Sequence, residues 1–412
     1  MYNFIIRLYA CFVRLVSPFH KKAKQMVCGQ KNTYRILGEK IDPHAKHIWV
    51  HCASLGEFEQ ARPMIETLKK EHPEYRIVLT FFSPSGYEVR KEYSYADVVC
   101  YLPFDTPKKV TAFLDLVKPT LAIFVKYEFW YNYIHEAYLR GIPVYLISAI
   151  FRDNQLFFKK KAGRYGKILH FYREIFVQDE HSKELLNRHG ITRVTVTGDT
   201  RFDRVIEIRR QAKELPLVHA FTADKESNGG MVLVAGSSWP PDEDIFIDYF
   251  NTRPRLKLII APHEIHESHL EEIEKKLKRP YIRYSAATEE NIRDRDCLIV
   301  DCFGLLSSIY RYGDIAYIGG GFGVGIHNLP EAAVYGIPVI FGPNYRKFRE
   351  AHDLIEKGGG FVVHDKKEFN ELMDRFAERP EALSTAGDNA EDYILSNAGA
   401  TRQIMEKMAA DL

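Results

Sequence analysis

Two series of short, continuously apolar runs are the feature that most restricts how this chain folds. Between residues 48 and 200, runs of β-branched, aliphatic or aromatic residues alternate with amphipathic stretches, and a second series of the same kind begins at Val232. Continuous apolar runs separated by helices indicate parallel strands that are covered on both faces. We therefore expect an α/β protein with two doubly wound, Rossmann-like domains.

The expected strands lie at comparable places in the two halves of the chain. In the first half they are Ile48–Val50, Arg76–Thr80, Val98–Leu102, Leu121–Val125, Val144–Ser148, Ile175–Val177 and Val194–Val196. In the second half they are Val232–Ala235, Lys257–Ile260, Cys297–Val300, Ile315–Ile318, Pro338–Phe341 and Phe361–Val363. Open α/β sheets bind ligands outside the carboxyl ends of their strands, so we expect a substrate cleft between the two sets of carboxyl ends.

Length and composition suggest how the chain divides. A chain of 412 residues, 46% of them hydrophobic, is too long for one core of ordinary size. The segment 212–230 is polar and rich in turn residues, which is typical of a linker. We expect a membrane-associated segment at 1–30, a domain at 31–215, a second domain at 216–395, and a final helix at 396–412 that packs back on the first domain.

Charge and cysteine usage exclude several classes of protein. The net charge of +2 lacks the basic excess of a dedicated nucleic-acid binder. The six cysteines are scattered without C-x-x-C spacing, which favours a reduced, cytosolic compartment over a disulfide framework or a zinc site. We expect no structural metal, no cofactor, no nucleic-acid partner and no second subunit.

The amino terminus predicts contact with a membrane. The apolar segment Phe4–Val16 is interrupted by Arg7 and Arg14 and is stopped by Pro18, short of the roughly 20 residues that a spanning helix needs. On one helix Arg7, Arg14 and Lys21 would share a face. This pattern favours a helix that lies in the plane of an anionic membrane surface. The alternative is a helix packed on the protein's own core.

One carboxylate follows the first expected strand at the turn into a helix. Ser54-Leu-Gly-Glu57 comes directly after the run that ends at Cys52, and apolar residues at helical spacing follow it. A carboxylate at this edge of a sheet can act as a base. The S-x-x-E spacing is also that of a capping box, in which Ser54 and Glu57 satisfy backbone amides at the start of a helix. Both interpretations remain open at this point.

The second series carries a glycine-rich loop after a strand. Gly319–Gly325 allows positive φ and close approach of a ligand, but its spacing is neither that of a Walker loop nor that of a dinucleotide fingerprint. It leads to Asn328-Leu-Pro-Glu331, in which Asn328 suits an N-cap and Pro330 suits the first helical turn. A helix start with free amides can bind an anion, and Glu331 can hold a ribose diol. A nucleotide sugar would meet both needs, whereas a capping box remains the alternative.

Two further loops are expected at the same cleft. Gly236 and Ser237 follow the first strand of the second series, and Pro262 and His263 follow the second strand. His263 and His266 have the chemistry of metal ligands, but their spacing without a third clear ligand favours polar lining of the cleft.

Several motifs together resemble the 3-deoxy-D-manno-octulosonic acid (Kdo) transferases of lipopolysaccharide assembly. They occur in that family's order over nearly the whole chain. They are Ser54-Leu-Gly-Glu57, Thr80-Phe-Phe-Ser-Pro-Ser-Gly86, Tyr127-Glu-Phe-Trp-Tyr-Asn132, Val177-Gln-Asp-Glu180, Val194-Thr-Val-Thr-Gly-Asp-Thr-Arg-Phe-Asp203 and His327-Asn-Leu-Pro-Glu331. The resemblance implies the two-domain architecture of GT-B glycosyltransferases.

The resemblance also implies an activity. It implies metal-independent, inverting transfer of Kdo from CMP-Kdo to the lipid A precursor lipid IVA, at the cytoplasmic face of the inner membrane, with Glu57 as general base. The implied CMP-binding residues are Pro262, His263, Phe303, Gly304, Leu305, Asn328, Leu329, Pro330 and Glu331. For the acceptor we expect Ser54, Gly56, Arg62, Lys126 and Arg152, the arginines because guanidinium groups suit phosphate.

This chain departs from the family pattern at five places. His263 replaces an arginine, Lys126 a glutamate, Asp199 an asparagine and Arg201 a lysine, and Gly325-Ile326 stands where the family has paired glycines. The competing interpretations are a UDP-sugar-dependent GT-B enzyme, such as a lipid A disaccharide synthase or a nucleotide-sugar epimerase, and a non-catalytic nucleotide-sugar scaffold at the membrane.

Overall fold

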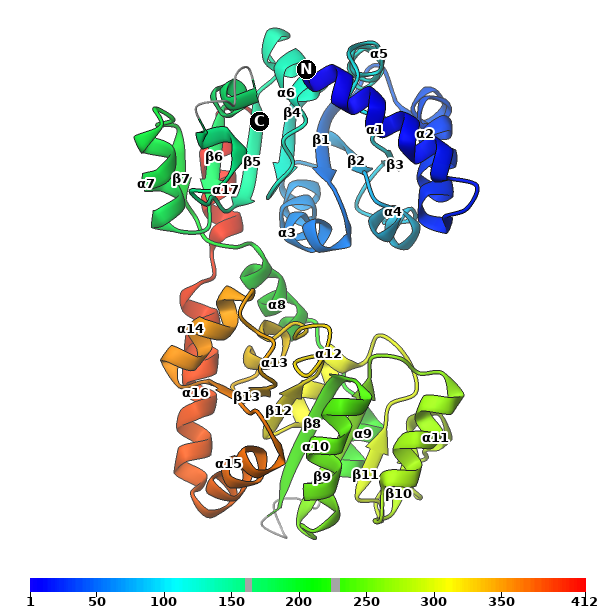
Figure 1. Ribbon diagram of the computed structural model, residues 1–412, viewed down its shortest axis with the longest axis vertical. Coiled ribbons are helices and arrows are strands. Elements are labelled where there is room, and N and C mark those ends of the chain that lie inside the picture. Colours follow the sequence, from blue (N-terminus) through cyan, green and yellow to red (C-terminus); the bar gives the residue numbers. More distant parts are fainter. Residues whose placement is uncertain (160–164, 224–229) are drawn as a thin grey trace. The chain divides into compact units, whose positions relative to one another are not determined.

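The computed structural model describes residues 1–159, 165–223 and 230–412 (Figure 1). The chain forms two compact units. The first contains Met1–Arg204 together with Ala398–Leu412, and the second contains Val205–Asn397. Each unit is built around one parallel sheet with helices on both faces. The predicted α/β class with two doubly wound domains is therefore confirmed.

The sheet of the first unit has the strand order β3-β2-β1-β4-β5-β6-β7. Its pairings are all parallel. The strands are β1 Lys46–Cys52, β2 Tyr75–Phe81, β3 Val98–Tyr101, β4 Pro119–Val125, β5 Val144–Ala149, β6 Glu174–Val177 and β7 Val194–Val196. All seven runs expected from the sequence are strands, and β1, β2 and β4 bury side chains on both faces of the sheet.

The sheet of the second unit has the order β10-β11-β9-β8-β12-β13-β14, and it is also parallel. Its strands are β8 Met231–Ser238, β9 Leu256–Pro262, β10 Tyr281–Arg283, β11 Cys297–Ile299, β12 Ile315–Ile318, β13 Val339–Phe341 and β14 Gly360–Val362. The expected runs are again strands. The edge strand β10 was missed, because it is short and its side chains are partly exposed, so no apolar run marks it.

Helices cover both faces of each sheet. In the first unit they are α1 Tyr2–Val16, α2 Lys21–Lys40, α3 Leu55–Glu71, α4 Pro84–Arg90, α5 Pro107–Val117, α6 Tyr131–Leu139, α7 Glu180–Arg188 and α17 Ala400–Met408, and α8 Arg201–Arg210 leads from the first unit into the second. In the second they are α9 Pro216–Thr222, α10 Pro240–Asn251, α11 Glu267–Lys276, α12 Leu306–Ile309, α13 Pro330–Ala333, α14 Arg349–Lys357, α15 Lys366–Glu378 and α16 Pro380–Ser396.

The strands of the first sheet send alternate side chains into two cores. Trp49 packs with residues of α5 and α6 on one face. Ile48 and Val50 pack on the other face with α3 and with Ile404 of α17. The last helix therefore belongs to the first core, although the sequence places it after the second domain.

The connection between the units differs from the expected linker. The units divide between Arg204 and Val205, inside α8, whereas we expected the division between residues 215 and 216. The turn-rich interpretation of 212–230 is wrong for part of that segment, because α9 forms there and buries Val218 and Phe221. The remainder of the expected linker, 224–229, lies outside the described residues. The second division falls between Asn397 and Ala398, two residues after the expected one.

The amino-terminal segment forms two helices instead of one. A turn at Ser17–Phe19 separates α1 from α2, which begins at Lys21. The expectation that Lys21 shares a helical face with Arg7 and Arg14 is therefore wrong. Helix α1 buries three small or aliphatic side chains against the first unit and exposes most of its large apolar ones. Across the described residues, no helix has both the length and the apolarity needed to cross a membrane.

Candidate functional site

The order of the first sheet reverses between β1 and β4. The chain places β2 and β3 on one side of β1 and then returns to add β4 on the other side. Connections leaving the carboxyl ends of β1 and β4 therefore diverge, and ligands bind α/β sheets at such a point. The loop after β1 carries Ser54 and Glu57, and the loop after β4 carries Lys126 to Trp130.

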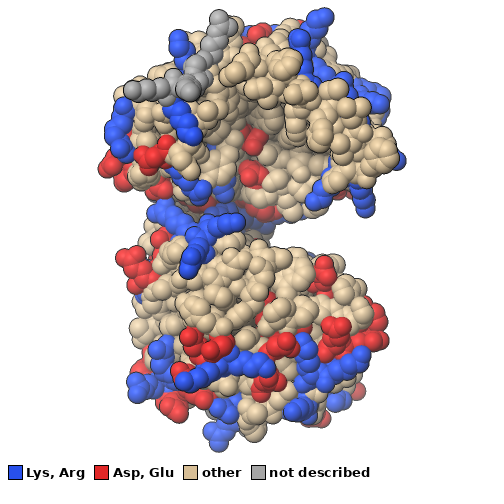
Figure 2. All heavy atoms as spheres, in the orientation of Figure 1, with Lys and Arg blue, Asp and Glu red and all other residues tan. Residues whose placement is uncertain are grey.

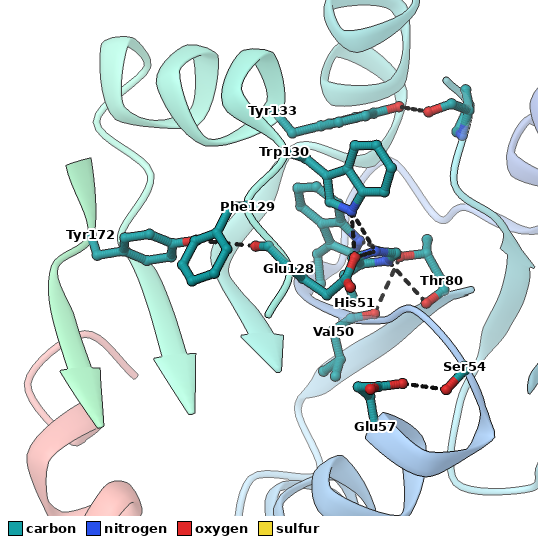
Figure 3. Close-up of polar contacts among 12 residues, drawn as sticks. Val50, His51, Ser54, Glu57, Thr80, Glu128, Phe129, Trp130, Tyr133 and Tyr172 are labelled. Atoms are coloured by element: carbon teal, nitrogen blue, oxygen red, sulfur yellow. Dashed lines mark hydrogen bonds and ion pairs between the residues drawn. The ribbon is translucent and has the colours of Figure 1, made fainter. Parts of the chain in front are cut away.

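Glu57 lies in the first turn of α3, and its carboxylate accepts a hydrogen bond from the Ser54 hydroxyl (Figure 3). Ser54 is the N-cap residue, and its carbonyl accepts from the Phe58 amide at 3.1 Å. Its side chain, however, makes no capping hydrogen bond to a backbone amide. The reciprocal capping box is therefore wrong, and the serine hydroxyl instead orients the acid.

A second carboxylate lies at the same end of β1. Glu128 Oε2 accepts from the indole nitrogen of Trp130 at 2.5 Å and lies 3.2 Å from His51 Nε2. The other ring nitrogen of His51 lies 2.9 Å from the Thr80 hydroxyl. Figure 3 shows this cluster beside the Ser54–Glu57 pair. The His51 side chain is fully buried and that of Glu128 is 12% exposed, so both groups are largely shielded from water.

The thiol of Cys52 lies close enough to both carboxylates to sense their charges. Burial raises its pKa well above the usual value, and the negative charges of Glu57 and Glu128 add to that shift. Two acids thus flank the end of β1. Their environments differ, because Glu57 is bound by one hydroxyl whereas Glu128 lies against an indole and an imidazole.

The loop after β4 begins in a strained conformation. Lys126 has φ of 62°, in the left-handed region that residues with a side chain seldom adopt. Its amide still donates to Ile147 at 2.9 Å, which continues the ladder to β5. Strain of this kind is typical of functional sites, where the surrounding structure imposes it.

The pKa of Tyr127 depends on the charges that surround this loop. Its pKa is raised, first of all by burial. The positive charges of Arg152 and Arg201 oppose this shift, and the negative charges of Asp179 and Glu57 add to it. Arg152 and Glu57 therefore both act on Tyr127 through their charges, and Arg152 is exposed.

Arg62 has a different environment from the one we expected. Its Nε donates to Glu66 at 2.7 Å, one turn further along α3, and a second guanidinium nitrogen lies 4.0 Å from Glu59. The ring of Tyr93 covers the same guanidinium at 5.8 Å. The structure therefore engages Arg62 in pairs along its own helix.

Two of the departures from the family pattern contact each other. The Asp199 carboxylate accepts from the Arg201 amide and from its Nε, both at 2.9 Å. It also accepts from the side-chain amide of Gln60 at 3.0 Å. Asp199 is 4% exposed, so these donors hold a nearly buried charge. An asparagine and a lysine at these two positions could not form the same ion pair.

In the second sheet the strand order reverses between β8 and β12. Gly236 and Ser237 are among the last residues of β8. The Gly319 amide donates to the Gly236 carbonyl at 2.9 Å. A Cβ on Gly236 would collide with the Tyr310 hydroxyl, and one on Gly319 would collide with the Ser237 carbonyl. These glycines are therefore needed for packing of the protein's own backbone and rings.

His263 lies in a stack of three rings. It stacks on Trp239 at a centroid distance of 4.8 Å and on His327 at 4.5 Å. The Trp239 indole donates to His327 Nε2 at 3.3 Å. Burial, to which the His263 charge adds, lowers the pKa of His327 to about 4, so this ring is neutral near pH 7. His266 serves another purpose, because its ring accepts from the His269 amide and caps α11.

A buried acid holds the glycine loop in place. One oxygen of Asp242 accepts from the Gly320 amide at 2.8 Å and from the Trp239 amide at 3.0 Å. Its other oxygen accepts from the Tyr317 hydroxyl at 3.0 Å. Asp242 thereby joins the loops after β8 and β12, and sequence reasoning did not single it out. Its place three residues after Trp239, in the first turn of a helix, was the available signal.

The segment after the glycine loop differs in detail from the expected capping box. Leu329, not Asn328, is the N-cap of α13, and its conformation is already helical. The side-chain amide of Asn328 donates to Glu331 at 2.6 Å. Helix α13 has only 4 residues, and the anion site expected at its start stays a prediction. Gly304 has φ of 87°, and the neighbouring Phe303 is 75% exposed.

Within the described residues, no group of three or more histidine, cysteine, aspartate and glutamate side chains is placed to hold a metal ion.

Comparison with known proteins identifies the family. The family model of the 3-deoxy-D-manno-octulosonic-acid transferases (Kdo transferases) matches residues 24–204. The Kdo transferase of Aquifex aeolicus is 32% identical over 328 residues, which cover 78% of this chain and 83% of that protein. The chain belongs to the Kdo transferase family. It is a glycosyltransferase of lipopolysaccharide biosynthesis, as the resemblance predicted.

A second Kdo transferase and a solved structure extend the comparison. The Kdo transferase of Haemophilus influenzae is 26% identical over 423 aligned positions, covering 97% of this chain and 94% of that protein. The structure of UDP-GlcNAc 2-epimerase from Neisseria meningitidis, bound to UDP-GlcNAc, has a TM-score of 0.60 at 16% identity. It covers 89% of this chain and 100% of that one, and it confirms the GT-B-like fold.

The cluster around Glu128 is the part of the candidate site that sequence reasoning did not assign. Glu128 and Trp130 belong to a motif that carried the resemblance, and His51 begins the opening turn. The sequence did not predict a role for them, because His51 lies 77 positions before Glu128 and 79 before Trp130. The available signal was their position directly after two strands that a parallel sheet brings together.

Proposed function

We propose that this Kdo transferase moves Kdo from CMP-Kdo to the lipid A precursor lipid IVA, with inversion at the anomeric carbon and without a metal ion. The observation that carries the proposal is the position of Glu57, an oriented carboxylate at the reversal point of the first sheet. Family membership supplies the donor class.

Glu57 acts as the general base in this proposal. The Ser54 hydroxyl occupies Oε2, so Oε1 remains for the acceptor hydroxyl. The acceptor oxygen gives its proton to Oε1 and forms a bond to the anomeric carbon, while the bond from that carbon to the CMP phosphate oxygen breaks. A positioned base of this kind contributes about 10²–10⁴-fold to a rate.

The donor is assigned to the loops of the second unit. Phe303 exposes its ring beside Gly304 and Leu305, and an exposed ring suits stacking on a nucleobase. Glu331, held by Asn328, suits a ribose diol. His263 directly follows Pro262, the last residue of β9, and its amide donates to the carbonyl of Ser238 at the end of β8 at 2.9 Å.

CMP is a good leaving group, so the protein's task is to stabilise the phosphate that departs. Hydrogen-bond donors fixed before the reaction serve this purpose without a metal. In the acceptor unit, Arg152 and Lys126 flank the site and suit phosphates of the lipid acceptor.

The proposed place of action is the cytoplasmic face of the inner membrane, where the protein acts as a monomer anchored by α1. The exposed fractions of Phe4, Leu8, Phe12 and Leu15 lie between 61% and 70%. These residues follow each other at helical spacing and form one apolar side, which favours insertion into the interface of a bilayer.

The test is mass spectrometry of products from the purified full-length protein given CMP-Kdo and lipid IVA. We expect the acceptor mass to increase by one or more Kdo units and CMP to appear, in the presence of EDTA as well as in its absence. Calorimetric titration should detect binding of CMP and not of UDP. Absence of a Kdo-bearing lipid, or preference for UDP, would overturn the proposal, and loss of activity in EDTA would overturn its metal-independent part.

A further inference from the structure

A basic pocket lies between α1 and the start of α5, away from the residues assigned to catalysis. It has a volume of about 310 Å³, at the lower end of small-molecule sites. Its lining contains four cationic side chains and no acidic one. The lining residues are Arg7, Ala10, Cys11, Arg14, Phe104, Thr106, Pro107, Lys108 and Lys109.

The two arginines lie two turns apart on α1, at the edge between its packed side and its exposed apolar side. Ile6, Ala10 and Val13 form the packed side, so a side chain at position 7 or 14 emerges beside it. The small Ala10 lies between the two arginines and leaves room for a ligand. A group held by both guanidinium ions would therefore sit at the boundary of the apolar side of α1.

The cations of the pocket lack acidic partners among the residues that the structure describes. There, no acidic side chain pairs with Arg7, Arg14 or Lys108. The ammonium of Lys109 lies 5.3 Å from the centre of the Phe104 ring. Burial lowers the pKa of Lys109, and the charge of Arg14 lowers it further. Like charges crowd together here, as they do where an anion completes a site.

The nearest carboxylate in the sequence is engaged elsewhere. Asp105 is buried, and it accepts from the Tyr2 hydroxyl at 2.5 Å and from the amides of Asn132 and Tyr133 at 3.0 and 3.1 Å. It therefore caps α6 and does not balance the charge of the pocket. Figure 2 shows lysine and arginine side chains around this end of the first unit.

We propose that this pocket binds the phosphodiester headgroup of an anionic membrane lipid, whose acyl chains lie along the exposed apolar side of α1. The inference rests on the proposed membrane association and adds a single, saturable lipid site to it. Arginine suits a phosphate because its planar donors bind two oxygens at once. The apolar side of α1 selects a lipid over a free phosphate, because only a lipid brings its phosphate with acyl chains.

The test is calorimetric titration of the full-length protein with dihexanoyl phosphatidylglycerol below its micelle concentration. The comparison ligands are dihexanoyl phosphatidylcholine, glycerophosphoglycerol and inorganic phosphate. The variant is Arg14→Gln with Lys108→Gln. The matched control is Lys21→Gln with Lys22→Gln, which removes the same charge from the start of α2, outside the pocket. Circular dichroism checks that both variants are folded.

We expect one phosphatidylglycerol per chain. Each basic side chain near an anionic lipid contributes about fivefold in affinity, so the pocket variant should bind about 25-fold more weakly. The control variant should bind like the wild type. Equal weakening in both variants, or no saturable binding, would overturn the proposal. Binding of inorganic phosphate or of phosphatidylcholine as tight as that of phosphatidylglycerol would also overturn it.

A separate activity measurement distinguishes this inference from the proposed function. Kdo transfer to an acceptor dispersed in neutral detergent should be the same in the wild type and in the pocket variant. If the wild type transfers no Kdo while the lipid titration behaves as expected, the proposed reaction fails and the lipid site stands. If transfer is normal and the titration shows no site, only the lipid site fails.

Discussion

The hydroxyl of Ser54 donates to the carboxylate of Glu57 and not to an amide of the helix that Ser54 precedes. The pair that looks like a capping box in sequence is therefore an oriented acid in the structure. Because one carboxylate oxygen is held, the other has a defined direction at the reversal point of the sheet, which is what a general base requires.

Substitution of Glu57 tests this role directly. We expect Glu57→Gln to lower kcat by about 10²–10⁴-fold, because glutamine cannot take the acceptor proton. The matched control is Glu59→Gln on the same helix, whose carboxylate pairs with Arg90 at 2.9 Å. It should keep near-normal turnover. The rate of CMP release measures the turnover of both variants. Near-normal turnover in folded Glu57→Gln would contradict the role of Glu57 as general base.

Ser54→Ala separates orientation of the acid from helix capping. Removal of a true side-chain cap costs about 1 kcal/mol. The Ser54 side chain caps no amide, so the free energy of unfolding should change by less than about 0.5 kcal/mol. The kcat of the variant should fall. Asp365→Ala is the comparison, since Asp365 accepts from the Glu368 amide at 2.9 Å. It should lower stability and leave kcat unchanged. The opposite pattern would restore the capping box.

The amino-terminal helix is bonded to the start of α6, which directly follows the loop that carries Glu128. The Tyr2 hydroxyl donates to Asp105 and accepts from the Tyr131 amide at 3.2 Å. Tyr2→Phe leaves both groups without this partner, so we expect a loss of about 1–3 kcal/mol in the unfolding of the first unit. Tyr9→Phe, on the same helix, should change nothing. Denaturant unfolding compares the two, and equal stability in both variants would contradict the prediction.

The stability of the second unit should depend on pH through His327. The pKa of His327 is about 4 in the folded protein and ordinarily 6.5. Between these values the unfolded chain binds a proton that the folded unit does not, so stability falls as pH falls from 6.5 to 4. Partial exposure reduces the effect to about 1–2 kcal/mol.

His327→Asn isolates this contribution from the acids that titrate in the same range. As the pH falls from 6.5 to 4, we expect the melting temperature of the wild type to fall relative to that of His327→Asn. Above pH 6.5 the difference should be constant. A difference that is flat across the whole range would show that His327 is not held neutral.

The contact between Asp199 and Arg201 predicts coupled substitutions. Arg201→Lys alone breaks a hydrogen bond to a nearly buried carboxylate, and Asp199→Asn alone removes the negative charge to which the arginine donates. The double variant restores the pair that the family commonly has. A double-mutant cycle on unfolding should give a coupling energy of about 1–3 kcal/mol. Additive effects would mean that the two positions vary independently.

Much of the fold was predictable because its signals are local. Continuous apolar runs indicated the buried parallel strands, and turn or helix residues marked their ends. Strand β10 was not predicted, because an edge strand needs no continuous apolar run. The linker was misjudged because α9 owes its helix to Phe221 and Val218, which pack in the tertiary structure, inside a segment that is otherwise polar.

The candidate site also has one part that local sequence predicted and one part that it did not. Glu57 was predictable because a strand, a turn and a helix follow each other within a few residues. The arrangement around Glu128 was not, because it depends on β1 and β4 lying side by side. Arg62 was a reasonable candidate by residue type, but whether a surface arginine is available depends on its neighbours, and Glu66 already binds it.

The sequence by itself determined two parallel α/β domains, the family, and the acid at the end of the first strand. These depend on residue types at short spacing and on motifs in a fixed order. Only the tertiary structure decided what the Ser54 hydroxyl binds, which residues surround Glu128, and that Arg14 and Lys108 line one pocket. The physical reason is that hydrogen bonds and charges act over a few ångströms, and folding alone sets which distant residues come within that range.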